Sequence, residues 1–358
     1  MPQIRDYRLI TEFTSSGGGQ CQWAFAERNG SPYFVKKFLS PRFPVEGSAG
    51  SERTKAEKRK RCEAFEAHHR TLMQRLRPRA GAGGSLVVAT DFFREGSTYY
   101  KVTEKIDTAT LPPERVARLD GTAKMVILRS VARSVQILHS EGIVHGDLKP
   151  DNILLKSDTS GGYVARLIDF DNSFFSGNPP EDPEEVVGDV VYYSPELAAY
   201  VQREPGTGQS ALTPSSDIYA LGLIYCRYLT GDLPRWDRRE FQYAFLASNS
   251  GAELSPAKGH CSPEFEEILC GMLSRDLKSR PKITDVQNGI QKELSWLKGG
   301  GTVVPVPDFS SKPRAEATAA SSVPGVKPML KKMGGASPAS KPAPPAERPK
   351  LKINIKRP

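Results

Sequence analysis

The stretch His145-Gly146-Asp147-Leu148-Lys149-Pro150-Asp151-Asn152 decides how this chain is interpreted. Between Asp147 and Asn152 it holds an acid, a lysine and an amide. Phosphoryl transfer from a nucleotide needs these three kinds of side chain: a base for the acceptor hydroxyl, a cation for the moving phosphate and a ligand for a metal ion. Each alone would be an ordinary loop residue, because Asp and Asn are common in turns. The combination indicates an active-site loop.

Further motifs follow this loop in a defined order. Asp169-Phe170-Asp171 comes after an apolar, strand-like segment, and Ser194-Pro195-Glu196 comes next. The stretch from Asp217 to Gly222 and the arginine Arg280 complete the series. In this order the motifs resemble the catalytic domain of the eukaryotic-type (Hanks-type) protein kinase superfamily. The His-Gly-Asp and Asp-Phe-Asp variants look most like those of its bacterial serine/threonine kinases. The resemblance covers roughly residues 7–297.

The hydrophobic pattern predicts an α+β fold in two lobes. Residues 1–103 alternate apolar and polar side chains between glycine-rich breaks, which is typical of a small antiparallel sheet. One basic helix, about 52–77, interrupts this sheet. Residues 104–297 have helical periodicity and are expected to form a large α-helical lobe. We expect Ser216 to cap a buried helix that begins at Asp217. The resemblance implies the same bilobal kinase fold.

Residues 298–358 change in composition and charge. They are rich in Pro, Ala, Ser, Gly and Lys, and such a segment cannot bury enough apolar surface to offset its ordering entropy. We expect a disordered basic tail. From residue 299 onwards it carries eleven basic and three acidic side chains, which account for +8 of the net charge of +9. The high isoelectric point therefore says nothing about the substrate of the folded part.

The rest of the composition bears on the compartment. No run of about 18 apolar residues occurs, so no membrane span is expected, and the N-terminus lacks the apolar core of a signal peptide. Five scattered cysteines never have CxxC spacing, which favours reduced thiols in a cytoplasmic protein over a disulfide framework or a zinc site. We also expect no specific nucleic-acid module.

Residue roles follow from this chemistry together with the resemblance. Asp147 is the candidate catalytic base, and Lys149 would neutralise charge on the transferred phosphoryl group. Asn152 and Asp169 would hold Mg²⁺. The resemblance implies that His145 packs beside the phenylalanine after Asp169 and aligns that aspartate. It also implies two structural contacts: Asp217 would accept hydrogen bonds from the catalytic-loop backbone, and Arg280 would pair with Glu196.

The nucleotide would be bound by the first lobe. Gly18 and Gly19 resemble the phosphate-covering glycine loop, since glycine lets the backbone approach phosphates closely. Lys36, in Tyr33-Phe34-Val35-Lys36, resembles the lysine that pairs with the α- and β-phosphates, although Lys37 also fits the pattern. Choosing Lys36 puts the bulky Phe34 where kinases usually keep a small residue against adenine.

The partner of that lysine and the adenine contacts are expected from the same resemblance. A glutamate on the 52–77 helix would pair with the lysine. Glu66 is our choice, Glu63 is the alternative, and the spacing places the slot nearer His69. The backbone of Glu104 and Ile106 would bind adenine at the hinge, next to Thr103 as gatekeeper.

Three positions depart from the family pattern. Gly146 replaces the arginine that normally senses an activation-loop phosphate, so phosphate-dependent switching is less necessary. Asp171 replaces a glycine and adds a carboxylate near the metal site. Asp189 stands where serine/threonine kinases commonly have threonine, and it could pair with Lys149.

The sequence therefore indicates an ATP- and Mg²⁺-dependent protein kinase that phosphorylates serine or threonine of a protein substrate. Two alternatives stay open. One is a pseudokinase, a nucleotide-binding scaffold without transfer, and the other is a small-molecule phosphotransferase. The basic tail could bind an acidic partner or could simply aid solubility.

Overall fold

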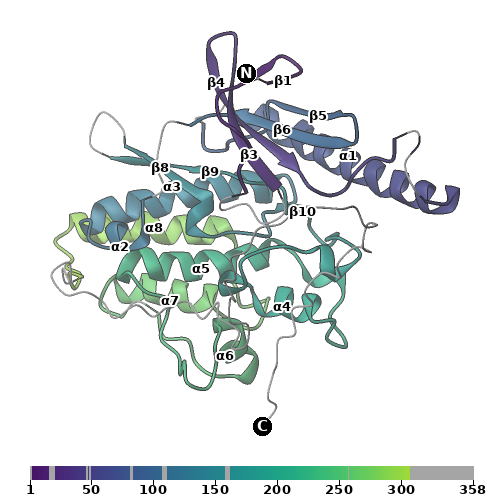
Figure 1. Cartoon of the computed structure of the whole chain (residues 1–358). Helices are drawn as coiled ribbons and strands as arrows, with labels where there is room; N and C mark the ends of the chain where they lie inside the picture. Colours follow the sequence, from purple (N-terminus) through teal and green to yellow (C-terminus); the bar gives the residue numbers. More distant parts are fainter. Residues whose placement is uncertain are drawn as a thin grey trace, which may run out of the picture. The chain divides into compact units, whose positions relative to one another are not determined.

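The computed structural model describes residues 2–15, 21–45, 47, 50–80, 84–106, 111–157, 162–256 and 258–306. They lie within one compact unit, which ends at Asp308. An antiparallel sheet with one long helix forms its first part, and helices dominate the second (Figure 1). The predicted α+β class is confirmed. The predicted disordered tail lies almost wholly outside the described residues and stays a prediction.

The first part is built on a six-stranded antiparallel sheet. Its strands follow the order β1 (Gln3–Ile4), β2 (Tyr7–Leu9), β3 (Cys21–Arg28), β4 (Ser31–Phe38), β6 (Thr98–Glu104) and β5 (Asp91–Glu95). A two-residue turn, Asn29-Gly30, joins β3 to β4 with positive φ at both positions, which is the conformation favoured for tight hairpins. Ala24, Val35 and Val102 are fully buried, and this core fixes the register of the sheet.

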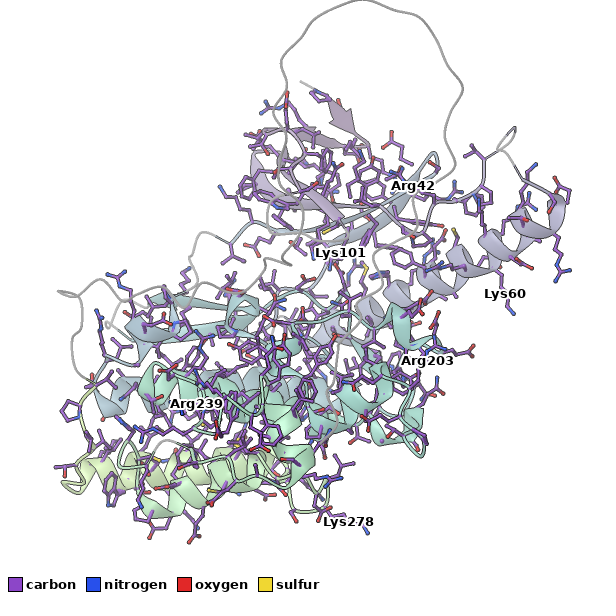
Figure 2. The ribbon with its side chains drawn as sticks, turned by 60° about the horizontal axis from the view of Figure 1, so that its bottom comes forward. Arg42, Lys60, Lys101, Arg203, Arg239 and Lys278 are labelled. Atoms are coloured by element: carbon purple, nitrogen blue, oxygen red, sulfur yellow. The ribbon has the colours of Figure 1, made fainter. Side chains whose placement is uncertain are left out.

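Helix α1 (Glu52–Ala80) extends the predicted 52–77 helix by one turn. Its buried residues, Cys62, His69, Leu72 and Leu76, recur at helical spacing and face the sheet or the second part. The first three turns are basic and largely exposed, and Figure 2 shows Lys60 there, pointing away from the rest of the protein. Burial of the second half therefore positions this helix.

The second part consists mainly of helices. They are α2 (Pro113–Val116), α3 (Gly121–Ser140), α4 (Pro195–Val201), α5 (Pro214–Thr230), α6 (Ala244–Ser250), α7 (Pro263–Met272) and α8 (Ile283–Lys298). Helix α5 is buried on nearly all sides and lies between α3 and α7 (Figure 1), as its sequence predicts. Its start was predicted wrongly. Thr213 caps α5, whereas Ser216 lies inside the helix and donates to Glu196.

Short strands and 3₁₀ turns flank the loops of the second part that face the sheet. They are the strands β7 (Ile143–Val144), β8 (Ile153–Ser157), β9 (Tyr163–Leu167) and β10 (Phe174–Phe175), and the 3₁₀ turns η1 (Pro150–Asn152), η2 (Pro183–Glu185), η3 (Val190–Tyr192) and η4 (Gln209–Ala211). The β8–β9 hairpin holds the catalytic-loop motif on one side and Asp169 on the other.

The folded part continues past the predicted boundary at residue 297. After α8 the chain turns back, and the amide of Val304 donates to the carbonyl of Gly259 at 2.8 Å. The five cysteines form no disulfide. Among the described helices, none has both the length and the apolarity that crossing a membrane requires.

Candidate active site

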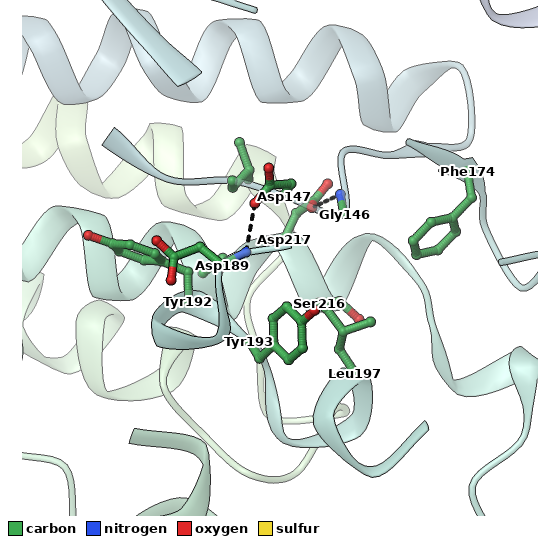
Figure 3. A pocket seen from close by; sticks show the side chains of 11 residues that line it. Gly146, Asp147, Phe174, Asp189, Tyr192, Tyr193, Leu197, Ser216 and Asp217 are labelled. Carbon is green, nitrogen blue, oxygen red and sulfur yellow. Dashed lines mark hydrogen bonds between the residues drawn. The ribbon is translucent and has the colours of Figure 1, made fainter. Parts of the chain in front are cut away.

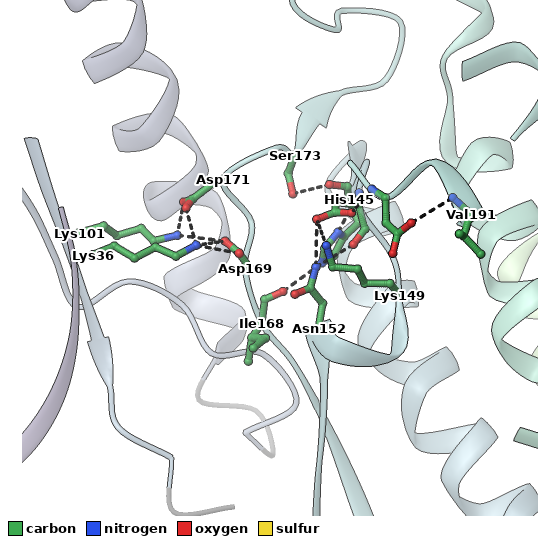
Figure 4. Close-up of polar contacts among 12 residues, drawn as sticks. Lys36, Lys101, His145, Lys149, Asn152, Ile168, Asp169, Asp171, Ser173 and Val191 are labelled. Atoms are coloured by element: carbon green, nitrogen blue, oxygen red, sulfur yellow. Dashed lines mark hydrogen bonds and ion pairs between the residues drawn. The ribbon is translucent and has the colours of Figure 1, made fainter. Parts of the chain in front are cut away.

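Asp147 lies at the centre of a hydrogen-bonded loop between β7 and η1. Its side chain is almost fully buried, and both carboxylate oxygens are used. Oδ1 accepts from the amide of Asp189 at 3.0 Å. Oδ2 accepts from Nζ of Lys149 at 3.0 Å and from Nδ2 of Asn152 at 3.3 Å (Figure 4). The three residues predicted from one short string therefore form one cluster.

Asn152 is oriented by this loop. Its Nδ2 also donates to the carbonyl of Asp147 at 2.8 Å, so the amide nitrogen points into the loop and Oδ1 is the atom left to coordinate a cation. The carbonyl of Asn152 accepts from the amide of Ile168 at 3.0 Å, which ties it to the residue before Asp169. An amide oxygen and a carboxylate from adjoining strands are oxygen donors of the kind Mg²⁺ uses beside substrate phosphates. The donor set fits that ion.

The loop backbone is anchored from helix α5. Asp217 accepts from the amides of His145 at 2.8 Å and Gly146 at 3.2 Å, and its third contact is Nε2 of His139 at 3.0 Å. The predicted role of Asp217 is confirmed. Figure 3 shows this anchor beside a small cavity under the loop, with room for about one water molecule (about 10 Å³).

The glycine at position 146 is required by the local backbone. Gly146 has φ of 78°, and a Cβ there would lie 2.7 Å from the carbonyl oxygen of Asn172. An arginine in this conformation would be strained and would clash with that carbonyl. The variant His-Gly-Asp string is therefore a structural requirement of this loop.

His145 connects the loop to Asp169. Its ring packs on Phe170 with centroids 5.5 Å apart, and its Nε2 lies 3.1 Å from the carbonyl of Ile168. These contacts agree with the structural role that the resemblance implies. Asp169 itself has φ of 64°, a strained conformation for a residue with a side chain and one that clusters at functional sites.

Lys36, and not Lys37, reaches the carboxylates. Nζ of Lys36 lies 2.6 and 2.7 Å from the two oxygens of Asp169 and 2.9 Å from Oδ2 of Asp171. Lys37 points to the opposite face of β4, where its Nζ lies 5.2 Å from the ring centroid of Phe13. Burial would lower the pKa of Lys36, but the two carboxylates outweigh burial and raise it above its ordinary value.

A second lysine, missed in the sequence, completes the cluster. Lys101 on β6 is paired with Lys36 in the strand register and is 8% exposed. Its Nζ contacts Oδ1 of Asp171 and lies 3.8 Å from Oδ1 of Asp169 (Figure 4). Position 101 lies two residues before Thr103, but only the register of β4 and β6 puts it opposite Lys36.

The predicted helix partner of the lysine is wrong. Glu66 accepts from the hydroxyl of Tyr99 at 2.7 Å and from Arg70 at 3.2 Å, and no contact joins it to Lys36. His69, nearer which the spacing placed the slot, lies close enough to the cluster for the charges of Asp171, Lys101 and Lys36 to act on it. His69 is buried among aromatic rings, with that of Phe65 4.4 Å away, and burial lowers its pKa to about 3. It is neutral at physiological pH.

Aromatic side chains share the sheet face of Lys36. Phe34 lies two residues before it on β4 and stacks on Trp23, with ring centroids 5.5 Å apart, and Phe25 contacts both rings. Glu104 ends β6 with an exposed side chain, and Ile106 follows it. Gly18 and Gly19 lie outside the described residues.

Asp189 does not pair with Lys149, contrary to the sequence expectation. Its Oδ1 accepts from the amide of Val191 at 3.0 Å and caps η3, and its own amide holds Asp147. A Cβ on the preceding residue, Gly188, would lie 2.9 Å from the ring of Tyr193 and 3.4 Å from Oδ1 of Asp147. This segment therefore supports the carboxylate of Asp147 through its backbone.

The expected pair of Glu196 and Arg280 is present. The guanidinium donates to both carboxylate oxygens, at 2.7 and 2.8 Å, and its side chain is completely buried. Arg280 also donates to the carbonyls of Ser215 and Ser274. This pair joins α4 to the start of α5, from which Asp217 holds the catalytic loop.

Comparison with known proteins agrees with this geometry. A family model described as the protein kinase domain matches residues 57–289. The chain is similar to ribosomal protein S6 kinase alpha-4 of Mus musculus, with 31% identity over 49% of this chain and 22% of that protein. The liver/testis isoform of the phosphorylase b kinase gamma catalytic chain of Homo sapiens is 33% identical over 54% of this chain and 42% of that protein.

A third relative is calcium/calmodulin-dependent protein kinase type II of Caenorhabditis elegans, 30% identical over 55% of this chain and 26% of that protein. In each case the match spans less than half of the relative.

Proposed function

This chain belongs to the protein kinase domain family, and from that premise we propose that it is an ATP- and Mg²⁺-dependent kinase of serine or threonine in a protein substrate. The observation that carries the proposal is the shared cluster of Asp147, Lys149 and Asn152, tied through Ile168 to Asp169. A base, a cation and two oxygen ligands in one place form the set that phosphoryl transfer needs.

Each residue has a definite role in this proposal. Asp147 accepts the proton of the acceptor hydroxyl, and its two occupied oxygens keep it oriented for that task. Lys149 leaves Asp147 to neutralise the transferred group. When bound, Mg·ATP supplies the γ-phosphate and a divalent charge, held by Asn152 and Asp169. Lys36 would contact the α- and β-phosphates, Gly18 and Gly19 would cover them, and the backbone of Glu104 and Ile106 would hold adenine.

The acceptor class rests on the relatives. Two of them are named for protein acceptors, ribosomal protein S6 and phosphorylase b, and we extend a protein acceptor to this chain from that similarity. The buried pair of Glu196 and Arg280 favours this reading over a small-molecule phosphotransferase, because it belongs to the motif series that resembles protein kinases.

One observation favours a pseudokinase as the second candidate. Phe34 and Trp23 stack on the sheet face of Lys36, where adenine would lie, and both carboxylates of the Asp-Phe-Asp motif already hold Lys36. A nucleotide would have to stack on these rings and take Asp169 from the lysine. If it cannot, the domain would act as a scaffold.

The test is transfer from radiolabelled ATP to a generic basic protein, followed by analysis of the phosphorylated amino acid. We expect the wild type to label serine or threonine and Asp169→Ala to label nothing, because it loses the metal ligand. Wild-type turnover equal to that of Asp169→Ala would reject the enzyme and favour the pseudokinase. Labelled tyrosine alone would reject only the acceptor class.

A further inference from the structure

The lysine of a kinase active site must be held by a carboxylate, and here helix α1 supplies none. In the family a glutamate on this helix pairs with it. His69, near the place expected for that glutamate, is buried and neutral. Glu66, one turn away, is held by Tyr99 and Arg70 instead. The position of the helix therefore cannot control Lys36 through an ion pair.

Asp171 contacts both lysines of the sheet. Its Oδ2 lies 2.9 Å from Nζ of Lys36, and its Oδ1 contacts Nζ of Lys101. Asp171 therefore lies between the two amines and offers each a separate carboxylate oxygen.

The sheet register makes such a carboxylate necessary. Lys36 and Lys101 are direct cross-strand partners on β4 and β6. Two like charges in this arrangement destabilise a sheet, and the cost is higher here because Lys101 is buried and Lys36 is only partly exposed. Figure 2 shows Lys101 inside the protein, whereas Lys60 and Lys278 point outwards. A second buried lysine opposite Lys36 is tolerated only if an acid lies between them.

We propose that Asp171 is the positioning residue for Lys36, replacing the helix glutamate of the family, and that Lys101 neutralises the extra carboxylate. The proposal rests on the kinase function proposed above. Asp169 can then leave Lys36 for a metal ion while Asp171 keeps the lysine in place. Asp169 and Asp171 lie on one segment, so the placement of that segment positions both the metal ligand and the carboxylate that holds Lys36. Movement of helix α1 is not required.

Charge explains why Asp171, Lys101 and His69 occur together. A carboxylate at 171 without Lys101 would add negative charge beside the phosphates and weaken nucleotide binding. Without Asp171, Lys101 would lie opposite Lys36, and neither lysine would have a carboxylate partner once Asp169 binds metal. A glutamate in place of His69 would duplicate the anchor. Asp171, Lys101 and His69 therefore act as one set.

The pair itself can be tested without turnover, in an Asp169→Asn background that removes the other partner of Lys36. Labelling of Lys36 by an amine-reactive reagent is followed by mass spectrometry. We expect labelling to stay slow in Asp169→Asn and to rise at least about tenfold when Asp171→Asn is added, because the amine then loses its last carboxylate partner; tenfold corresponds to about 1.4 kcal/mol. Adding Glu66→Gln instead should leave it slow.

A further variant, which places a carboxylate on helix α1, is the control for misfolding. Adding His69→Glu to the Asp169→Asn, Asp171→Asn protein should return labelling to the slow rate, which a merely misfolded protein would not do. Equal labelling with and without Asp171, or a rise with Glu66→Gln, would overturn the proposal. These outcomes do not depend on whether the protein transfers phosphate.

A second experiment measures turnover in proteins that keep Asp169. Asp171→Gly, which introduces the family glycine, should lower kcat/KM for ATP about 10²-fold, as expected when a positioned group moves by about 1 Å. His69→Glu added to this variant should restore most of it. Unchanged kcat/KM in Asp171→Gly would contradict the positioning role, whereas an inactive wild type would reject the proposed function and leave the labelling result to decide on the pair.

Discussion

Asp147→Asn separates catalysis from folding at the centre of the proposed site. The two side chains have nearly the same shape, but Asn cannot accept the proton of an acceptor hydroxyl. A positioned acid–base group contributes about 10²–10⁴-fold to a rate, equivalent to about 3–5 kcal/mol of activation free energy. We expect kcat to fall by that factor while KM for ATP changes little, because Asp147 contacts the loop and not the sheet.

The structure also gives the folding cost of this change. All three donors to Asp147 are within 3.3 Å: the amide of Asp189, Lys149 and Asn152. Whichever way the new amide turns, its NH₂ faces at least one of them, and an unsatisfied buried donor costs about 1–3 kcal/mol. Stability should fall by that amount and leave the protein folded at 25 °C.

The assay pairs steady-state kinetics with urea unfolding of the same preparations. Asp151→Asn is the matched control, since it removes an exposed carboxylate from the same loop. The control should keep wild-type kcat and stability. If Asp147→Asn retained kcat within tenfold of wild type, or lost activity only in proportion to its unfolded fraction, Asp147 would not be the base.

Four other expectations follow from single features. Arg280→Met should cost about 3–5 kcal/mol of unfolding free energy by urea titration, because it leaves Glu196 buried without its charge partner. The folded-state pKa of His69 is lowered, so acid favours the unfolded state: stability relative to His69→Gln should be unchanged above pH 6.5 and fall by about 2 kcal/mol at pH 5. Since Gly146 removes the phosphate-sensing arginine, phosphatase treatment should leave kinase activity intact, and strong inactivation would refute this. Removing residues 307–358 should preserve the thermal transition and peptide phosphorylation, while any binding to polyanions, itself weakened by salt, should disappear.

Local pattern predicted much of this fold. Alternating apolar residues predicted the sheet, and helical periodicity predicted the helix at about 52–77, because burial of one face at a fixed period decides both. The side chains between Asp147 and Asn152 form their cluster mainly with one another. Their chemistry could therefore be predicted from their spacing in the sequence. Helix α5 begins earlier than Ser216 suggested, because Thr213 is followed by Pro214, and proline suits the first position of a helix.

The charge cluster could not be predicted in the same way. Lys101 meets Lys36 only through the register of two strands more than sixty positions apart in sequence, and no local pattern carries that register. Asp171 reaches both because Asp169 adopts a left-handed backbone conformation. Family resemblance pointed to a glutamate on the helix, and tertiary packing put Glu66 against Tyr99 instead.

The most direct measurement of the central claim is a single-turnover experiment with enzyme in excess over γ-labelled ATP and a basic protein acceptor. Excess enzyme removes product release from the observed rate. We expect transfer that requires Mg²⁺, disappears in Asp169→Ala and is slowed about 10²–10⁴-fold in Asp147→Asn. The same transfer in all three proteins, or none in the wild type under conditions where it binds ATP, would reject the proposed kinase activity.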